Sequence, residues 1–137
     1  MAVVTPANMP WRSSDSARTG LAGVRVLIAE DEFLLGAQLE DELHAAGCTT
    51  LGPYTSVTRA AQACREARFD VALLDVNLHG EMIYPVADEL RARGSPFVLL
   101  TGYGTANLPE HLRSAPRVAK PYDPTALLRE IRRALGR

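Results

Sequence analysis

The feature that most constrains the fold of this chain is a regular alternation of short apolar runs with longer helical patterns. The runs are Val24–Ala29, Cys48–Gly52, Val71–Leu74, Phe97–Leu100 and Arg117–Ala119. Three of them are rich in Val, Leu and Ile, which is typical of strands covered on both faces of a sheet. The second run contains two threonines and suits an edge of the sheet.

Helical patterns occupy the segments between and after these runs. In one of them, Leu35, Leu39 and Leu43 repeat at four-residue spacing, as on the buried face of an amphipathic helix. Another begins with Asp123 and Pro124, a residue pair favoured at helix starts. The expected helices are Glu32–Ala46, Ser56–Arg68, Met82–Arg93, Gly104–Ala115 and Pro124–Leu135. The fourth contains Pro109 and few apolar residues, so we expect it to be short or labile.

This alternation predicts the α/β class, with a doubly wound, five-stranded parallel sheet and helices on both faces. Ligands of such sheets bind beyond the carboxyl ends of the strands. The strand order 2-1-3-4-5 would gather the ends of the first, third, fourth and fifth strands around one crevice.

Length and composition narrow the function classes. The 137 residues suit one domain, and we expect a flexible tail over 1–22 and a folded domain over 23–137. Fifteen basic and sixteen acidic residues nearly balance, which does not indicate direct nucleic-acid or membrane binding. No apolar run has the length of a membrane span, and no signal peptide is evident. Cys48 and Cys64 lack metal-ligand spacing and fit reduced thiols in the cytoplasm.

Polar side chains stand where four of the five expected strands end. They are Glu30, Asp31 and Glu32 after the first, Asp75 after the third, Thr101 after the fourth and Lys120 after the fifth. Each alone is typical of a helix cap or a solvated turn. Asp75, however, follows four apolar residues, and a carboxylate in such a neighbourhood is costly unless its charge is compensated.

Together these residues predict a binding site for Mg²⁺. Glu30, Asp31 and Asp75 would form an oxygen-rich nest, with the backbone carbonyl of Asn77 as a further ligand. Mg²⁺ prefers a few carboxylates together with waters and phosphate oxygens. Lys120 would balance the remaining negative charge.

The same residues suit phosphoryl transfer to a carboxylate. Asp75 would attack phosphorus and form an acyl phosphate, while Lys120 and the hydroxyl of Thr101 would contact its oxygens. The sequence has no Walker lysine loop, kinase signature or GxSxG elbow. The chain is therefore expected to receive a phosphoryl group rather than take one from ATP.

With these strand-end residues, the chain resembles the receiver domain of two-component response regulators. The stretches that carry the resemblance are "LIAEDE", "LLDVNL", "LLTGY" and "KPY". The resemblance implies a flavodoxin-like receiver fold of order 2-1-3-4-5 with five flanking helices. It also implies Mg²⁺ as cofactor, and phosphorylation by a histidine kinase or a histidine phosphotransfer protein.

Matched residue by residue, the resemblance assigns roles to the strand-end side chains. It implies that Glu30 and Asp31 are the acidic pair, that Asp75 is the phospho-acceptor and that Thr101 is the switch hydroxyl. Lys120 would contact the phosphate, and Pro121 would follow a cis peptide bond.

One position departs from the family pattern. Receivers usually carry Tyr or Phe three residues before the lysine, and this chain has Arg117. The stretch "PFVLLTGYG" resembles the PFxFATGY motif of a subgroup that lacks this aromatic residue, although Leu99 and Leu100 differ from the motif. We expect Tyr103 and the segment 102–115, with the face of the last helix, to carry the signal.

The leading hypothesis is a stand-alone receiver that acts as a signalling switch or a phosphate sink. It predicts no enzyme activity beyond self-phosphorylation and self-dephosphorylation, and an unidentified downstream protein as partner. One alternative is a small Mg²⁺-dependent phosphatase or phosphotransferase, but Asn77 stands where such an enzyme would carry its general acid. The others are a receiver fragment of a larger regulator with an output domain, and a degenerate receiver that acts by binding alone.

Overall fold

The computed structural model describes residues 20–102 and 108–137. Its centre is a five-stranded parallel sheet in the order β2-β1-β3-β6-β7. These strands are β1 Arg25–Ala29, β2 Thr49–Tyr54, β3 Val71–Asp75, β6 Phe97–Thr101 and β7 Arg117–Ala119. The order agrees with the expected 2-1-3-4-5 once two short hairpin strands, β4 and β5, are set aside, and β2 lies at an edge as expected.

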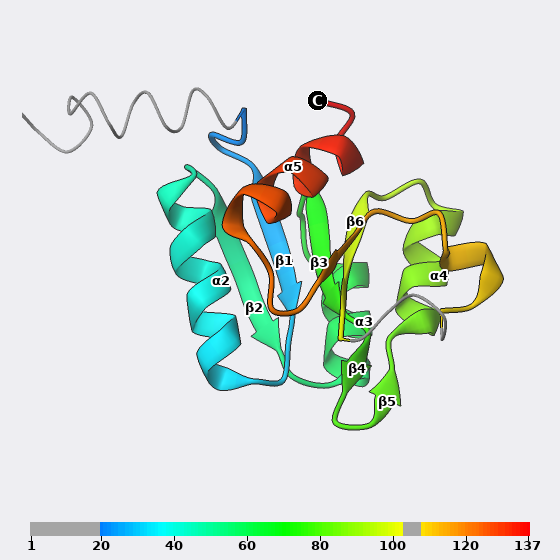
Figure 1. The fold of residues 1–137 in the computed structure, drawn as a ribbon. Coiled ribbons are helices and arrows are strands. Elements are labelled where there is room, and N and C mark those ends of the chain that lie inside the picture. The colour runs from blue at the N-terminus through cyan, green and yellow to red at the C-terminus, as the bar shows by residue number, and fades with distance from the viewer. Residues whose placement is uncertain (1–19, 103–107) are drawn as a thin grey trace, which may run out of the picture.

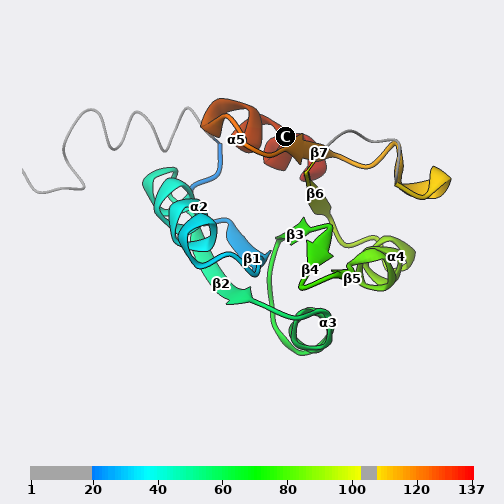
Figure 2. The same cartoon turned by 60° about the horizontal axis from the view of Figure 1, so that its bottom comes forward.

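Helices cover both faces of this sheet (Figure 1). They are α2 Phe33–Ala45, α3 Val57–Glu66, α4 Tyr84–Ala92 and α5 Pro124–Ala134. Figure 2 shows α2 and α5 on one side of the sheet and α3 and α4 on the other. Because neighbouring side chains of a strand point to opposite faces, Val26 and Ile28 pack with α2 and α5, while Leu27 and Ala29 pack with α3 and α4. The sheet is thus buried on both faces.

Two helices begin at side chains that cap their first backbone N–H groups. The Ser56 side chain accepts a hydrogen bond from the backbone N–H of Arg59 at 3.1 Å. The Asp123 side chain accepts one from the N–H of Ala126, also at 3.1 Å. Each cap satisfies an N–H group that has no partner inside the helix. The α5 cap also places the start of this helix directly after the end of β7.

The predicted number of helices is wrong for the residues that the structure describes. They form four α-helices, and the expected helix Gly104–Ala115 is represented only by a 3₁₀ turn, Glu110–Leu112; residues 103–107 lie outside the described residues. Pro109 directly precedes the turn, where its missing N–H cannot continue an α-helical hydrogen-bond pattern from an earlier turn. This segment is therefore shorter than a receiver helix of the expected length.

A β-hairpin that the sequence analysis did not predict follows β3. Its strands are β4 Asn77–Leu78 and β5 Glu81–Met82, which pair antiparallel. The two residues between them, His79 and Gly80, both have positive φ, of 52° and 84°, as in two-residue hairpin loops of type I′. The hairpin lies at the same end of the sheet as the strand-end carboxylates (Figure 1).

At the start of the chain, residues 1–19 of the expected tail lie outside the described residues. Leu21, which we had also assigned to the tail, is fully buried and packs with the α2–α5 core. The division at residue 23 otherwise stays a prediction. Over residues 20–102 and 108–137, none of the helices combines the length and the apolar character that crossing a bilayer requires.

Candidate functional site

The carboxyl ends of the strands surround an open pocket of about 880 Å³. Asp31, Asp75, Thr101 and Lys120 all line it, and Glu30 lies buried beside them with 1% of its surface exposed. The residues come from four strand ends because the parallel strands deliver their carboxyl ends to one edge. The fold therefore brings together the side chains that the sequence analysis singled out.

Lys120 holds two carboxylates at the centre of the pocket. Its Nζ atom lies 2.8 Å from Oδ2 of Asp75 and 3.0 Å from Oε1 of Glu30. Burial alone would lower the pKa of Lys120, but its hydrogen bonds to these two carboxylates outweigh burial and raise it. The lysine is accordingly a charged group that is fixed between Asp75 and Glu30.

The backbone around Lys120 is tied to the neighbouring strand. The N–H of Lys120 donates to the carbonyl of Thr101 at 2.7 Å. The Lys120–Pro121 peptide bond is cis, as the resemblance implied. Thr101 ends β6 with 5% of its surface exposed and lines the pocket from this buried position.

Three carboxylates crowd this site. Glu30, Asp31 and Asp75 each offer an oxygen, and these oxygens lie within 4.8 Å of one another. Oε2 of Glu30 accepts hydrogen bonds from the N–H groups of Asp31 and Glu32 at 2.9 and 3.3 Å. Burial, and next the contact with Asp75, raise the pKa of Glu30. One lysine is therefore too little positive charge for all three carboxyl groups to ionise easily.

These residues fit a divalent cation such as Mg²⁺. Three clustered carboxylates beside a single ammonium are the hard oxygen donors and the excess charge that this ion balances. Asp31 faces the pocket and is only half-buried, which leaves it accessible to an ion. For Asp31, burial works against ionisation, but hydrogen bonds from His79 and neighbouring groups prevail and lower its pKa.

Asn77 lines the pocket in the first hairpin strand. Its N–H donates to Oδ1 of Asp75 at 3.2 Å, and its side-chain oxygen accepts from the N–H of Gly80 at 2.7 Å. These contacts hold Asn77 next to Asp75. That its backbone carbonyl is a metal ligand stays a prediction.

His79 is a neighbour of the site that the sequence analysis treated as an ordinary loop residue. Its N–H donates to Oδ2 of Asp31 at 3.0 Å, and its Nδ1 atom lies 3.5 Å from the same oxygen. The hairpin turn, at which His79 takes a positive φ, creates this contact. The dipeptide His79–Gly80 was the available signal, because glycine in the second turn position is common in such loops.

The expected signalling residue Tyr103 lies outside the described residues, whereas Arg117, the position that departs from the family pattern, is described. Arg117, which replaces the usual aromatic residue, donates through its guanidinium to the carbonyl of Arg113. It thus contacts the end of the 3₁₀ turn rather than the phosphate pocket.

Comparisons with known proteins place this site in a family. No family model matches the chain. Over 117 residues it is 30% identical to the transcriptional regulatory protein PdtaR of Mycobacterium tuberculosis. The matched region covers 82% of this chain but only 57% of PdtaR. The chain therefore spans little more than half the length of the curated relatives it matches.

Solved structures match more completely. SdrG from Sphingomonas melonis is 34% identical with a TM-score of 0.74, over 84% of this chain and 98% of SdrG. The receiver domain of PhyR from Erythrobacter litoralis is 26% identical with a TM-score of 0.71, over 85% and 93%. The receiver domain of the sensor histidine kinase PA1611 from Pseudomonas aeruginosa, with magnesium coordinated in its active site cleft, is 25% identical with a TM-score of 0.68, over 85% and 100%. With its sheet order and its cluster of strand-end carboxylates, the chain belongs to the receiver domains of two-component response regulators.

Proposed function

We propose that this chain accepts a phosphoryl group on Asp75 from a histidine kinase or a histidine phosphotransfer protein and acts as a switch or a phosphate sink. One observation carries the proposal: Lys120 bridges Asp75 and Glu30 at the floor of an open pocket, 2.8 and 3.0 Å from their oxygens. This arrangement sets the Asp75 carboxyl group against a fixed positive charge, which is what a carboxylate nucleophile for phosphorus requires.

The transfer itself is a substitution at phosphorus. An oxygen of Asp75 forms the new P–O bond while the P–N bond of the donor phosphohistidine breaks. The imidazole nitrogen keeps the bonding electron pair and takes up a proton from solvent. Lys120 and the hydroxyl of Thr101 hold the phosphoryl oxygens, so that positioning and charge neutralisation lower the barrier.

Glu30, Asp31 and Asp75 would hold Mg²⁺, with Asn77 as a further ligand through its carbonyl. When bound, the ion supplies positive charge that neutralises phosphoryl oxygens during transfer. His79 holds Asp31 from the hairpin side, which orients this carboxylate toward the pocket. The magnesium named in the PA1611 receiver supports this choice of ion.

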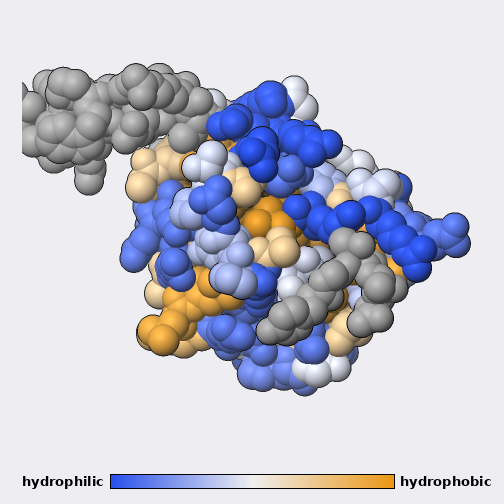
Figure 3. All heavy atoms as spheres, viewed as in Figure 1, coloured by the Kyte–Doolittle hydropathy of each residue, from blue (hydrophilic) through white to orange (hydrophobic). Residues whose placement is uncertain are grey.

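The surface beside the pocket supports a protein as the donor. Phe33 and Leu34, at the start of α2, are 86% and 80% exposed, and they form an apolar patch at the end of α2 nearest the site (Figure 3). Leu35 continues from this patch into the pocket lining. Large exposed apolar side chains next to a reactive group are typical of a surface that a partner protein covers.

The other parts of the proposal follow from the same site. We propose that the chain works in the cytoplasm, where histidine kinases present their phosphohistidine, and that it belongs to the PFxFATGY-type receivers. No enzyme activity is proposed beyond self-phosphorylation and self-dephosphorylation. Asn77 is two residues beyond Asp75, and its amide cannot protonate a leaving group as a carboxylic acid does.

The proposal is tested by labelling the full chain with acetyl phosphate and reading its intact mass. We expect one added phosphoryl group in the presence of Mg²⁺ and none with EDTA. Asp75→Asn should abolish the label. Asp70→Asn is the matched control, because Asp70 binds the backbone N–H of Arg25 at the start of β1, away from the site. Equal labelling of wild type and Asp75→Asn would refute the assignment.

A further inference from the structure

Besides Oε1 of Glu30, which forms an ion pair with Lys120, two buried side-chain oxygens of the described residues have no fully formed hydrogen bond. One is the hydroxyl of Tyr122, and the other is Oε2 of Glu42. Neither meets another polar atom of the described residues at full hydrogen-bond geometry. Buried polar groups are nearly always paired, so each such atom calls for a physical explanation.

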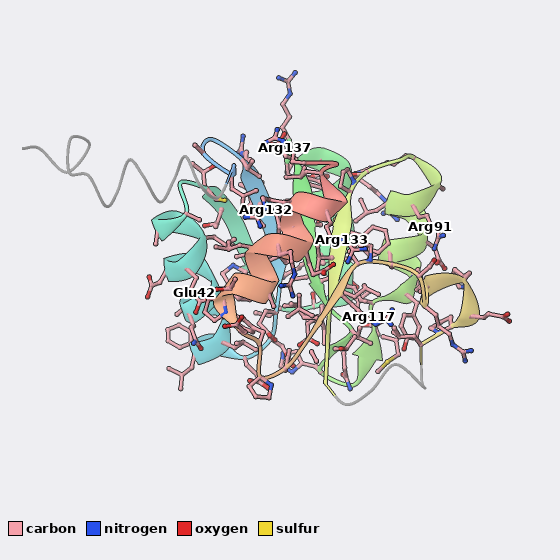
Figure 4. All side chains as sticks on the ribbon, turned by 45° about the horizontal axis from the view of Figure 1, so that its top comes forward. Glu42, Arg91, Arg117, Arg132, Arg133 and Arg137 are labelled. Carbon is pink, nitrogen blue, oxygen red and sulfur yellow. The ribbon has the colours of Figure 1, made fainter. Side chains whose placement is uncertain are left out.

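The two groups face each other. Glu42 lies on α2 where this helix passes the start of α5 (Figure 4), and Tyr122 packs against the core beneath both helices. Burial raises the pKa of Glu42, and a contact with the Tyr122 hydroxyl lowers it in part. For Tyr122, burial, and next the charge of Glu42, raise the pKa. A hydrogen bond from the Tyr122 hydroxyl to Glu42 would satisfy both of these buried atoms.

Tyr122 is also close to the reacting groups. It is two residues beyond Lys120 along the chain, across the cis Lys120–Pro121 bond, and it lines the same pocket. The charge of Glu30 contributes to raising its pKa, which places the ring near the buried end of the site. Tyr122 therefore connects the lysine to helix α2.

We propose that Glu42 and Tyr122 are a positioning pair that holds Lys120 against Asp75. This inference rests on the proposed phosphoryl transfer to Asp75, and it assigns both residues a role that acts only through Lys120. The hydroxyl of Tyr122 fixes the loop after β7 to α2, and the loop in turn fixes the lysine backbone. Neither Glu42 nor Tyr122 touches the phosphoryl group.

The geometry explains why such a tie is needed. Lys120 must reach two carboxylates at once, at 2.8 and 3.0 Å. On one side of it, the chain is held by the hydrogen bond from its N–H to Thr101. On the other side, the Asp123 cap holds only the start of α5. Tyr122 lies between the hydrogen bond to Thr101 and the Asp123 cap, and its hydroxyl can bind to Glu42 on α2.

The test compares Glu42→Gln, Tyr122→Phe and the double variant in the full chain. We measure the labelling rate with saturating acetyl phosphate and Mg²⁺, and separately the dissociation constant for Mg²⁺. Tyr54→Phe and Glu40→Gln are matched controls, because each changes the same residue type elsewhere in the fold. Melting temperatures identify any variant that fails to fold, and the other single variant then carries the comparison.

We expect Tyr122→Phe to slow labelling about five- to tenfold, as the loss of one buried hydrogen bond implies. Glu42→Gln should slow it to a similar extent, and the double variant should be no slower than the slower single variant. Mg²⁺ binding should stay equal or tighten, because a loosened ammonium competes less with the ion. The two controls should label at the wild-type rate.

Labelling within twofold of wild type in both single variants would overturn the inference, as would additive effects in the double variant. A parallel weakening of Mg²⁺ binding would overturn it as well, since that indicates a general disturbance of the pocket. Failure of the wild-type chain to label at all would instead count against the proposed function. The two failures are thus distinguishable.

Discussion

Among single residues, Glu30 shows the electrostatic character of the site most clearly. It is almost fully buried, yet the ammonium group that pairs with it, that of Lys120, is shared with Asp75. An ionised carboxylate is stable in such a place only when enough positive charge surrounds it. The metal-free protein therefore holds Glu30 at a cost that a bound cation removes.

This cost predicts a pH dependence of stability in EDTA. Burial and Asp75 raise the pKa of Glu30 from 4.5 to about 8. Below pH 4.5 both folded and unfolded chains bind the proton, so the contribution of Glu30 to stability is complete there. Between pH 4.5 and about pH 8 the unfolded chain has lost this proton while the folded chain still keeps it. The free energy of unfolding therefore falls as the pH rises through this range. We expect Glu30 to account for a fall of at least about 1 kcal/mol between pH 5 and pH 8.

The measurement is urea unfolding of wild type and Glu30→Gln in EDTA across that pH range. The difference between the two proteins isolates Glu30, because the slopes from other groups cancel. Adding Mg²⁺ should remove most of the fall in the wild type. A wild-type stability that stays parallel to that of Glu30→Gln from pH 5 to pH 8 would contradict the account.

Sequence reasoning reached the individual site residues for a definite physical reason. In a parallel sheet the carboxyl ends of the strands share one edge, so Asp75 and Lys120 could be placed together without knowing their side-chain positions. The contact between Glu42 and Tyr122 could not be found this way. It depends on how α2 packs on the loop after β7. Tyr122 belongs to the "KPY" stretch, but no sequence pattern pairs it with Glu42.

Among the elements, the backbone of strand β2 comes unusually close to that of its neighbour β1 at Gly52. Gly52 has a φ of 94°, and a Cβ atom there would lie 2.6 Å from the carbonyl oxygen of Ile28. Glycine alone adopts this φ at little cost, and here the backbone of β1 also leaves no space for a side chain. The register between the two strands shifts at the same place.

We therefore predict that Gly52→Ala lowers the free energy of unfolding more than Gly94→Ala does. Both glycines have positive φ, but a Cβ atom at Gly94 would meet nothing within 4 Å. Positive φ alone costs about 1–2 kcal/mol for alanine, and the contact with Ile28 should add to this in Gly52→Ala. Chemical denaturation of both variants checks the order. Equal losses would show that β1 yields easily at this point.

Over residues 108–117, backbone carbonyls are held by arginine side chains, and the described residues there form a 3₁₀ turn. Arg91 donates to the carbonyl of His111, Arg113 to that of Leu108 at 3.2 Å, and Arg117 to that of Arg113. These guanidinium groups (Figure 4) satisfy carbonyls that an α-helix would have paired internally. They give Arg117 a structural contact in place of the usual aromatic residue.

Arg117→Ala is accordingly expected to loosen this segment locally. The amide protons of Leu112 and Arg113, which bind the carbonyls of Pro109 and Glu110, should exchange with solvent about fivefold faster, as the loss of about one hydrogen bond implies. Arg68→Ala, in the loop between α3 and β3, is the control. Unchanged exchange at both amides, or a uniform increase over the whole chain, would contradict this role of Arg117.

The elements themselves were predicted where their signals were local. Apolar runs identified the five sheet strands, and Ser56 and Asp123 identified two helix starts. The β4–β5 hairpin was missed because its strands have two residues each, too few for an alternating pattern. The fourth expected helix, Gly104–Ala115, is a 3₁₀ turn in its described part. Pro109 and the scarcity of apolar residues had indicated that it would be short, but not that it would lose its α-helical form.

On the scale of the whole molecule, one end of the doubly wound sheet carries both the pocket and an apolar patch. The pocket and the apolar residues Phe33 and Leu34 share the end of the molecule at which the strands finish (Figures 1 and 3). A protein donor that presents a phosphohistidine to Asp75 must cover part of this end. A small donor such as acetyl phosphate needs only the pocket.

Because only a protein donor would cover the patch, changes to the patch should affect transfer from a protein donor and not labelling by a small donor. Phe33→Ser with Leu34→Ser should slow transfer from a phosphorylated histidine kinase at least about tenfold, since buried apolar side chains at interfaces commonly contribute more than 1 kcal/mol each. Labelling by acetyl phosphate should stay within twofold of wild type. Comparing the two rates in the same variant tests whether the patch binds the protein donor. An equal loss with both donors would show that the patch supports the pocket and does not bind a partner.

The central claim is that Asp75 is the residue that receives the phosphoryl group. Borohydride reduction converts an aspartyl phosphate into homoserine, and peptide mass spectrometry then locates it in the labelled chain. The account predicts Mg²⁺-dependent homoserine at position 75 and at no other aspartate. Reduction at another acidic residue, or none at position 75 in a chain that carries label, would contradict it.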